Sequence, residues 1–264
     1  MSMLRAVALL VGLFASLQAA ASGLPAEAAP PIYFAAEDWP PFISASLAGD
    51  GLSGTMARAA FARAGYQFKV NYFPWKRTMR LGLTDPAYAG FLAVWRTPER
   101  EKLCYFSAPI GNTLTVLAYL KEAPPSASTL EQLEGSKIGT VAGYSNGEQF
   151  DALVRRGVLR VEEGVNDDTN LRKLLKRRFG VIVIEKHVLR HMLTGSQFSD
   201  ADRARIGISE TFFKERPVHM CFKRTAQGLE QQHRFNEAAR EIDLLKLERD
   251  YWRHAGAAGG APGY

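Results

Sequence analysis

A five-residue segment, GYSNG at positions 143–147, has the G-x-S-x-G spacing of the nucleophile elbow of α/β-hydrolases. It follows an expected strand and precedes an expected helix, which is the context that a nucleophilic serine requires. No HGGG-like segment precedes it, however, and no pattern downstream selects an acid and a histidine. The alternative is that the Ser145 hydroxyl and the backbone N–H groups of this turn bind an anion at a helix N-terminus.

Arg100 is the second candidate for chemistry, in the segment WRTPERE at 95–101. Pro98 favours a turn after a buried strand, and an arginine placed there can point into a cleft. Its planar guanidinium would then bind a carboxylate through two parallel hydrogen bonds. The other role open to it is a capping or salt-bridging arginine, and the residues alone do not decide between the two.

Two histidines, His187 and His191, are spaced four apart and would share one helix face, as a zinc-binding pair does. No glutamate follows His187 as in H-E-x-x-H, and no third ligand suggests itself. There is also no P-loop and no G-x-G-x-x-G segment. We therefore expect surface histidines, no metal site and no cofactor.

Alternating strands and helices must position these residues. We expect strands at 32–36, 67–73, 87–95, 113–120, 137–142, 158–161, 181–184 and 218–222. We expect helices at 53–64, 75–83, 147–156, 168–178, 185–193 and within 227–252, with Ser53 as the first N-cap and a capping box at Ser128 opening a further helix. A Pro-Pro-Ser segment at 124–126 divides the elements into two groups. The pattern predicts an α/β protein with two lobes and largely parallel sheets.

The first 21 residues have a basic start, about a dozen apolar residues and a small-residue end, which is typical of a secretory signal peptide. The sequence is 47% hydrophobic, enough to build a core, and its formal net charge is +6. Export argues against a nucleic-acid partner, so we interpret the basic run at 172–178 as an exposed helix face. We expect the small-residue tail, 255–264, to be disordered and outside the fold.

Cys104 and Cys221 are the only cysteines. An oxidising compartment permits a bridge between them. Both lie in apolar, strand-like runs, and the sequence leaves open whether their side chains face each other.

Four segments resemble, in order, the family 3 extracellular solute-binding proteins, the periplasmic receptors of polar amino acid uptake systems. They are EDWPPF at 37–42, WRTPERE at 95–101, YFSAPI at 105–110 and IGTVAGYSNG at 138–147, within a match that extends from about Ile32 to Arg253. The resemblance implies a two-lobed, periplasmic-binding-protein-like fold of type II with a ligand cleft between the lobes. Lobe 1 would comprise 30–112 and 217–254, and lobe 2, with the hinge crossings, 113–216.

The resemblance also implies a ligand site. Arg100 would bind the ligand's carboxylate, the loop containing Ser145 and Asn146 would add donors from the other lobe, and Glu185 would receive an ammonium group. Aromatic residues would enclose the ligand's side chain. The full expected set is Glu37, Trp39, Trp75, Trp95, Arg100, Ser145, Asn146 and Glu185.

The chain departs from this family in the strand before the T-x-x-R turn. Small hydroxyl residues are usual there, whereas this chain has LAVWR at 92–96, and the usual aspartate of a G-F-D-x-D segment is absent around 55–56. Arg96 would place a second cation in the region. That favours a more acidic ligand, unless Arg96 pairs with Glu99 or Glu101.

We therefore expect a periplasmic, monomeric binding protein, not an enzyme, that captures a small polar or amino-acid-like solute, zwitterionic or anionic, for the membrane permease of an ABC-type uptake system. Three alternatives stay open. One is a dehydratase-like enzyme on the same scaffold with Glu185 or Glu37 as general acid. The others are a serine hydrolase built on Ser145 and a ligand-sensing module with a membrane partner.

Overall fold

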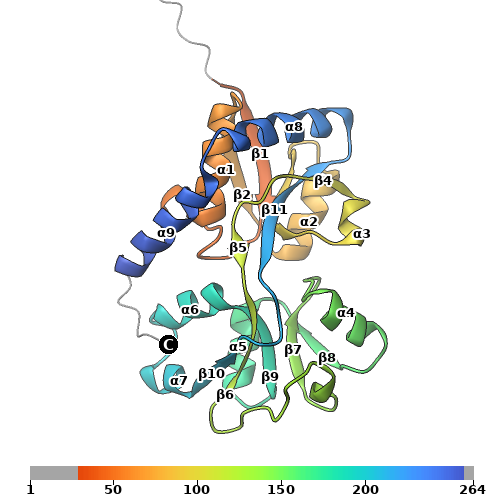
Figure 1. Cartoon of the computed structure of the whole chain (residues 1–264), viewed down its shortest axis with the longest axis vertical. Coiled ribbons are helices and arrows are strands. Elements are labelled where there is room, and N and C mark those ends of the chain that lie inside the picture. Colours follow the sequence, from red (N-terminus) through yellow and green to blue (C-terminus); the bar gives the residue numbers. More distant parts are fainter. Residues whose placement is uncertain (1–28, 259–264) are drawn as a thin grey trace, which may run out of the picture.

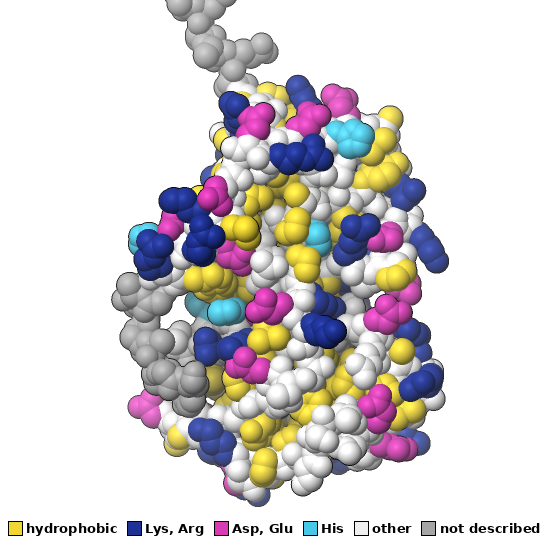
Figure 2. All heavy atoms as spheres, in the orientation of Figure 1, with side chains coloured by type: hydrophobic (Ala, Val, Ile, Leu, Met, Phe, Trp, Pro, Cys, Tyr) yellow, Lys and Arg dark blue, Asp and Glu magenta, His cyan; other side chains and the backbone are white. Residues whose placement is uncertain are grey.

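The computed structural model describes residues 29–258. The expected signal peptide, 1–21, lies outside this range. Within the described range, no helix has the length and apolar character needed to cross a bilayer. On the face shown in Figure 2, side chains of both charge signs are interspersed.

The chain forms two α/β lobes, each built on its own sheet, as the sequence predicts (Figure 1). In lobe 1 the strand order is β2-β1-β3-β11-β4, and β5 pairs with β11. The strands are β1 (Pro31–Ala36), β2 (Gln67–Tyr72), β3 (Gly90–Trp95), β4 (Cys104–Phe106), β5 (Asn112–Thr113) and β11 (Arg216–Lys223). The helices are α1 (Gly51–Arg63), α2 (Trp75–Thr84), α3 (Pro98–Glu101), α8 (Ala226–Arg240) and α9 (Leu244–Ala258), with a 3-10 turn at Ala48–Asp50.

In lobe 2 the strand order is β10-β6-β9-β7-β8. The strands are β6 (Thr115–Leu120), β7 (Ile138–Val141), β8 (Val161–Gly164), β9 (Val181–Glu185) and β10 (Ile206–Ser209). The helices are α4 (Glu148–Arg155), α5 (Asp167–Leu175), α6 (Lys186–Thr194) and α7 (Asp200–Arg205), with a 3-10 turn at Glu131–Leu133. The chain passes between the lobes twice, from β5 into β6 and from β10 into β11 (Figure 1).

The parallel strands of each lobe set the place of the site. β1 pairs in parallel with β2 and β3, and β7 pairs in parallel with β8 and β9. The carboxyl ends of parallel strands lie at one edge of a sheet, and the loops that follow them line a crevice. Hydrogen bonds between these loops join the two lobes, so the two edges face each other.

The core of lobe 1 contains an aromatic cluster, which forms because side chains alternate between the two faces of the sheet along each strand. Phe34 of β1 and Phe68 of β2 point to the same face and meet Phe61 of α1, whose ring lies 5.5 Å from each of the other two. Phe222 of β11 packs edge-on against Phe34 at 5.2 Å. This burial holds α1 against the sheet and fixes the edge from which the site residues extend.

The prediction of largely parallel sheets is wrong, because β11 pairs antiparallel with β3, β4 and β5, and β6 pairs antiparallel with β9 and β10. Four predictions about individual elements also need correction. Helix α1 begins at Gly51, so Ser53 lies buried inside it and is not the N-cap. The capping box expected at Ser128 does not open a helix. The backbone N–H and the hydroxyl of Ser128 both donate to the Gln132 side chain, and the segment forms a 3-10 turn at Glu131–Leu133. Strand β8 begins at Val161, where we expected it to end.

The fourth correction concerns the tail. Helix α9 continues through Ala258, four residues into the segment expected to be disordered. Alanine has the highest helix propensity, and a helix already formed extends at little cost. Positions 259–264 lie outside the described residues.

A disulfide joins Cys104 of β4 to Cys221 of β11, which the sequence left open. The two strands pair side by side, with Cys221 opposite Phe106, and the two Cα atoms are 5.4 Å apart. That separation lies within the range that a disulfide spans. Both cysteines are buried in the cluster around Phe91 and Trp75.

Candidate functional site

Three tryptophans at the strand ends of lobe 1 form what we call the aromatic cage: Trp39 after β1, Trp75 after β2 and Trp95 at the end of β3. Each is 5–7% exposed. Trp39 and Trp95 meet edge to face, with ring centroids 5.5 Å apart. The structure therefore brings these three residues together, and their role in binding stays a prediction.

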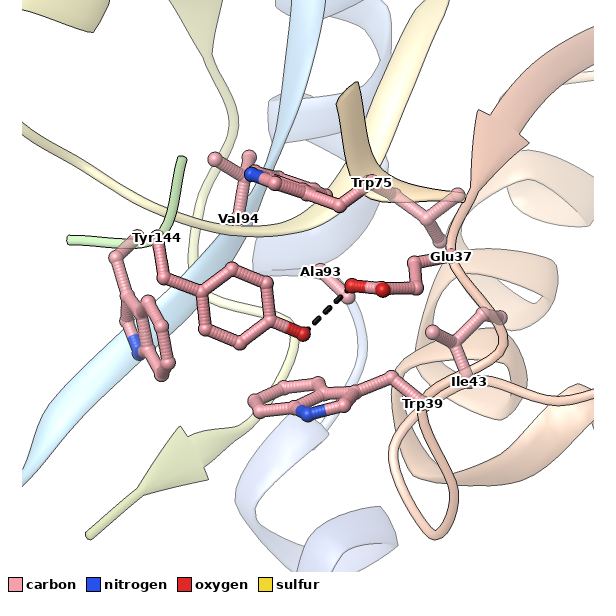
Figure 3. A pocket seen from close by; sticks show the side chains of 9 residues that line it. Glu37, Trp39, Ile43, Trp75, Ala93, Val94 and Tyr144 are labelled. Carbon is pink, nitrogen blue, oxygen red and sulfur yellow. Dashed lines mark hydrogen bonds between the residues drawn. The ribbon is translucent and has the colours of Figure 1, made fainter. Parts of the chain in front are cut away.

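Tyr144 of lobe 2 fills the cage (Figure 3). Its ring lies 5.7 Å from Trp75, 5.7 Å from Trp95 and 6.5 Å from Trp39, nearly perpendicular to each. Its hydroxyl donates a 2.6 Å hydrogen bond to Glu37, which follows β1. A cavity of about 10 Å³ is left among these residues, which is about the space of one water molecule.

The indole N–H groups are all hydrogen-bonded, two of them across the crevice. Trp75 donates to the Gly143 carbonyl at 3.0 Å, and Trp39 donates to Asp167 at 3.3 Å. Trp95 donates to Thr113 at 2.8 Å, within the first crossing. Each cage residue is therefore fixed in orientation as well as buried.

Arg100 lies beside the cage, in the short helix α3 that Thr97 caps. Its Nη1 donates to the carbonyl of Trp95 at 2.8 Å and its Nη2 to the carbonyl of Gly143 at 3.1 Å. The guanidinium carbon is 5.4 Å from the centre of the Trp75 ring. Burial, reinforced by the nearby positive charge of Arg216, lowers the pKa of Arg100 to about 10.

Arg216, at the start of β11, is the second cation of the site. Its Nη2 donates to Thr115 at 3.3 Å and to the carbonyl of Ser145 at 3.2 Å, and its guanidinium carbon is 4.5 Å from the centre of the Trp95 ring. Burial lowers its pKa to about 10 as well. Within residues 29–258, neither Arg100 nor Arg216 has a carboxylate at ion-pair distance. We call these two residues the arginine pair.

Arg96, which the sequence suggested as the second cation, points elsewhere. It forms an ion pair with Glu101, and its side chain is 59% exposed. This is one of the two pairings that the sequence left open. Sequence reasoning missed Arg216, because its place beside the cage depends on the return crossing of the chain and has no local motif.

Two carboxyl groups lie at the other side of the cage, half-buried Glu37 and buried Asp167. Burial raises the pKa of Glu37 to about 8, against the hydrogen bond from Tyr144, and the charge of Asp167 adds to the rise. Burial likewise raises the pKa of Asp167, the first residue of α5, to about 7. We call Glu37 and Asp167 the acid pair. The sequence identified Glu37 and missed Asp167.

Glu185 is placed differently from Glu37. Its two oxygens accept hydrogen bonds from the N–H groups of Leu114, at 3.1 Å, and Val188, at 2.8 Å. It thus caps helix α6 and fastens the crossing segment, and burial raises its pKa to about 8. Its expected contact with a ligand ammonium stays a prediction.

Ser145 and Asn146 are held by Asp151 of α4. The Ser145 hydroxyl donates to Asp151 at 2.8 Å, and the Asn146 N–H donates to its other oxygen at 3.0 Å. A serine nucleophile needs a hydrogen-bonded base that can take its proton, commonly histidine. Here the partner is a carboxylate that also orders the loop, and Ser145 presents its carbonyl to Arg216.

The strand beneath the cage contains a bulge at Ala93. The pairing of β3 with β11 shifts register there, and Ala93 has a left-handed φ of 58°. A non-glycine residue in this region is strained, and bulges re-aim the side chains next to them. Ala93 lines the small cavity (Figure 3). The segment that departs from the family pattern is therefore also locally irregular.

A second contact joins the lobes away from the cage. His187 of α6 stacks on Trp252 of α9, with centroids 4.1 Å apart, and Phe42 packs edge-on against both rings. We call these three residues the latch. Burial, together with the charges of Arg190 and Lys186, lowers the pKa of His187 to about 4.

Within the described range, no group of three or more metal-ligating side chains comes together.

No family model matches this sequence, and no curated protein matches it. Solved structures match the fold closely. A histidine kinase sensor domain similar to periplasmic binding proteins has a TM-score of 0.71 at 15% identity, covering 85% of this chain and 95% of that one.

Two amino-acid-binding structures match comparably. The GluR0 ligand-binding core from Nostoc punctiforme, in complex with L-glutamate, has a TM-score of 0.66 at 17% identity and covers 84% of this chain and 97% of that one. The holo arginine-binding protein ArgBP from T. maritima has a TM-score of 0.63 at 16% identity and covers 81% and 90%. This chain therefore has the two-lobed fold of periplasmic binding proteins, as its resemblance to family 3 predicts.

Proposed function

We propose that this protein is a monomeric periplasmic solute-binding protein that captures a small zwitterionic, amino-acid-like solute between its lobes. It delivers the solute to the membrane permease of an ABC-type uptake system. The solute's carboxylate binds the arginine pair, and its cationic group lies in the aromatic cage near the acid pair. No covalent chemistry is part of this proposal.

The observation that carries the proposal is the arginine pair. Both guanidiniums are largely buried. Within the described residues, their hydrogen bonds go to backbone carbonyls and one hydroxyl. A charge removed from water is costly unless a counter-charge compensates it. A ligand carboxylate supplies that counter-charge and forms the bidentate hydrogen bonds that arginine favours.

The positions of the acid pair support a zwitterion over a plain anion. Arg100 and Arg216 contact the carbonyls of Gly143 and Ser145, at the backbone end of Tyr144, whereas Glu37 accepts from its phenol. The two poles are thus separated by about the length of one tyrosine side chain. A solute carrying both charges over a similar distance satisfies both poles, and it stabilises contact between the lobes through its differential affinity.

Transport and sensing begin with the same capture step and differ in the membrane partner. The uptake role is therefore tested separately, by whether the solute-loaded protein stimulates solute entry into vesicles that contain the permease. Loading without stimulated entry by any candidate permease favours the sensing role.

The capture step is tested by thermal unfolding with a panel of amino acids and betaines. A solute at 100 times its dissociation constant should add about 2.7 kcal/mol to the free energy of unfolding. Arg100→Ala should weaken carboxylate binding by roughly 1.5–3 kcal/mol, the worth of a charged hydrogen bond. Arg100→Lys should recover only part of it, because lysine lacks the planar fork.

The opposite pattern would count against the proposal. If Arg100→Ala lowers the unfolding temperature of the protein alone but leaves solute affinity intact, then Arg100 is scaffolding, and the carboxylate binds elsewhere.

A further inference from the structure

Tyr144 occupies the cage in the manner of a guest. It comes from lobe 2, whereas the three indoles that surround it come from lobe 1. In Figure 3 its ring lies between Trp75 and Trp39 and its hydroxyl points at Glu37. We propose that Tyr144 is an internal competitor for the cage, which a solute's cationic head group must displace to bind. This inference rests on the proposed function.

The ring geometry favours a positively charged guest. An aromatic ring carries a negative face and a positive edge, so perpendicular pairs place an edge against a face. Tyr144 meets all three tryptophans at interplanar angles of 82–87°. Indole faces of the kind that surround the Tyr144 ring are the surfaces that hold a quaternary or alkyl ammonium group in an aromatic cage.

Glu37 supports the same class of guest. Its recorded side-chain partner is the Tyr144 phenol, and the nearby charges that act on it, those of Asp167 and Asp38, are negative. Burial therefore favours its protonated form. A cationic head group in place of the phenol reverses that preference, so Glu37 releases its proton to the solvent as the head group enters.

The loop that carries Tyr144 can move it. Gly143 and Gly147 flank the segment with φ values of 82° and 99°, which favour glycine. Its anchors are the hydrogen bonds that Gly143 accepts from Trp75 and Arg100, that Ser145 accepts from Arg216, and that Asp151 accepts from Ser145 and Asn146. The ring can therefore leave the cage by a local change of this loop or by separation of the lobes, without unfolding of a helix or strand.

The test compares Tyr144→Ala and Tyr144→Phe with the intact protein, with Tyr33→Ala as the matched control because Tyr33 is exposed on β1. The probe is tetramethylammonium chloride, referenced to sodium chloride at equal ionic strength. Three of the four tryptophans form the cage, so tryptophan fluorescence reports binding. Full-length mature protein, cleared of bound solute by unfolding and refolding, is used throughout.

We expect Tyr144→Ala to bind tetramethylammonium about tenfold more tightly than the intact protein, because apparent affinity scales with the fraction of open cage. Tyr144→Phe should gain less, because its ring still fills the cage although it cannot bond to Glu37. Tyr33→Ala should match the intact protein. Should Tyr144→Ala misfold, the Tyr144→Phe gain alone decides the matter.

Equal or weaker binding by both Tyr144 variants would overturn the inference, because Tyr144 would then be neutral or part of the grip on the solute. Tetramethylammonium has no carboxylate, so this result does not depend on whether the arginine pair binds a carboxylate. If the inference fails in this way but zwitterion binding is still weakened by Arg100→Ala, the proposed function is retained. The converse result is tighter tetramethylammonium binding by the Tyr144 variants together with zwitterion affinity that is unchanged in Arg100→Ala. It would support competition by Tyr144 for the cage and would exclude Arg100 as the carboxylate-binding residue.

Discussion

The cage and the latch both join lobe 1 to lobe 2, but they do so with different chemistry. The cage brings the phenol of Tyr144 to the half-buried carboxyl group of Glu37 and the indole of Trp39 to the buried one of Asp167. The latch stacks the imidazole of His187 on Trp252. Burial at the first contact favours protonated acids, against the hydrogen bonds from Tyr144 and Trp39 that lower their pKa. Burial at the second contact favours a neutral base.

The two contacts therefore respond to pH with opposite sign. For Glu37 the pKa is 4.5 in water and about 8 in the cage, so the joined lobes hold a proton that separated lobes release between these values. Raising the pH through this window favours separation. For His187 the pKa falls from 6.5 to about 4, so contact at the latch is lost as the pH falls through that window. The two windows overlap between pH 4.5 and 6.5, where the contributions of Glu37 and His187 to lobe contact change with opposite sign and offset each other.

The largest expected effect is that of Glu37→Gln. In the intact protein, contact between the lobes should weaken from pH 4.5 to about 8, by at most ~1.4 kcal/mol per pH unit for one proton. The variant should lose the contribution of one proton and keep that of Asp167, whose pKa is about 7, so that about half of the slope due to the acid pair remains below pH 7 and little of it above. The radius of gyration from X-ray scattering, measured across the pH range, reports lobe separation.

Asp38→Asn is the matched control for this measurement, since Asp38 adjoins Glu37 in the sequence and is exposed. It should leave the slope almost unchanged and move the upper end of the window slightly down, because the charge of Asp38 is the smallest of the causes that raise the pKa of Glu37. A full slope in Glu37→Gln would show that Glu37 does not control the contact.

A smaller effect is expected from His187→Phe. Phenylalanine can stack on Trp252 and cannot take a proton, so the variant should keep the lobes in contact at lower pH than the intact protein does. The charged groups that act on His187 are Arg190, Lys186 and Glu210, and all three remain in the variant. Tryptophan fluorescence between pH 4 and 6.5 measures the difference. The control is His254→Gln, because His254 lies on the exposed side of α9. If the fluorescence changes below pH 6.5 are identical in the intact protein and both variants, the latch is excluded as a pH-sensitive contact.

The smallest effect is expected from Arg96→Gln. Arg96 and Glu101 form an exposed ion pair, of the kind that contributes about 0–1 kcal/mol to the free energy of unfolding. The variant should bind solutes as the intact protein does, which contrasts with Arg100→Ala only four positions away. Isothermal titration with the solute found for the intact protein makes the comparison. A loss equal to that of Arg100→Ala would mean that general positive charge, and not the position of Arg100, holds the carboxylate.

The sequence predicts most of the fold and the lobe 1 side of the site, because both are local. Alternation and turn residues locate the strands, and Glu37, Trp39, Trp75 and Arg100 all follow strand ends. The roles of Tyr144, Asp167 and Arg216 depend on how the lobes meet, which no short segment encodes. Tyr144 lies within the G-x-S-x-G segment, but that pattern indicates a function for Ser145 and none for Tyr144. The latch was missed for the same reason, since its rings come from segments far apart in the chain.

The disulfide in lobe 1 has a topological consequence for lobe 2. Cys104 and Cys221 are separated by 117 positions, and the whole of lobe 2 lies in the stretch that they enclose. A protease that cuts any surface loop there produces two fragments that stay covalently tied. Nicked protein should therefore migrate as one full-mass band until a reductant separates it into two.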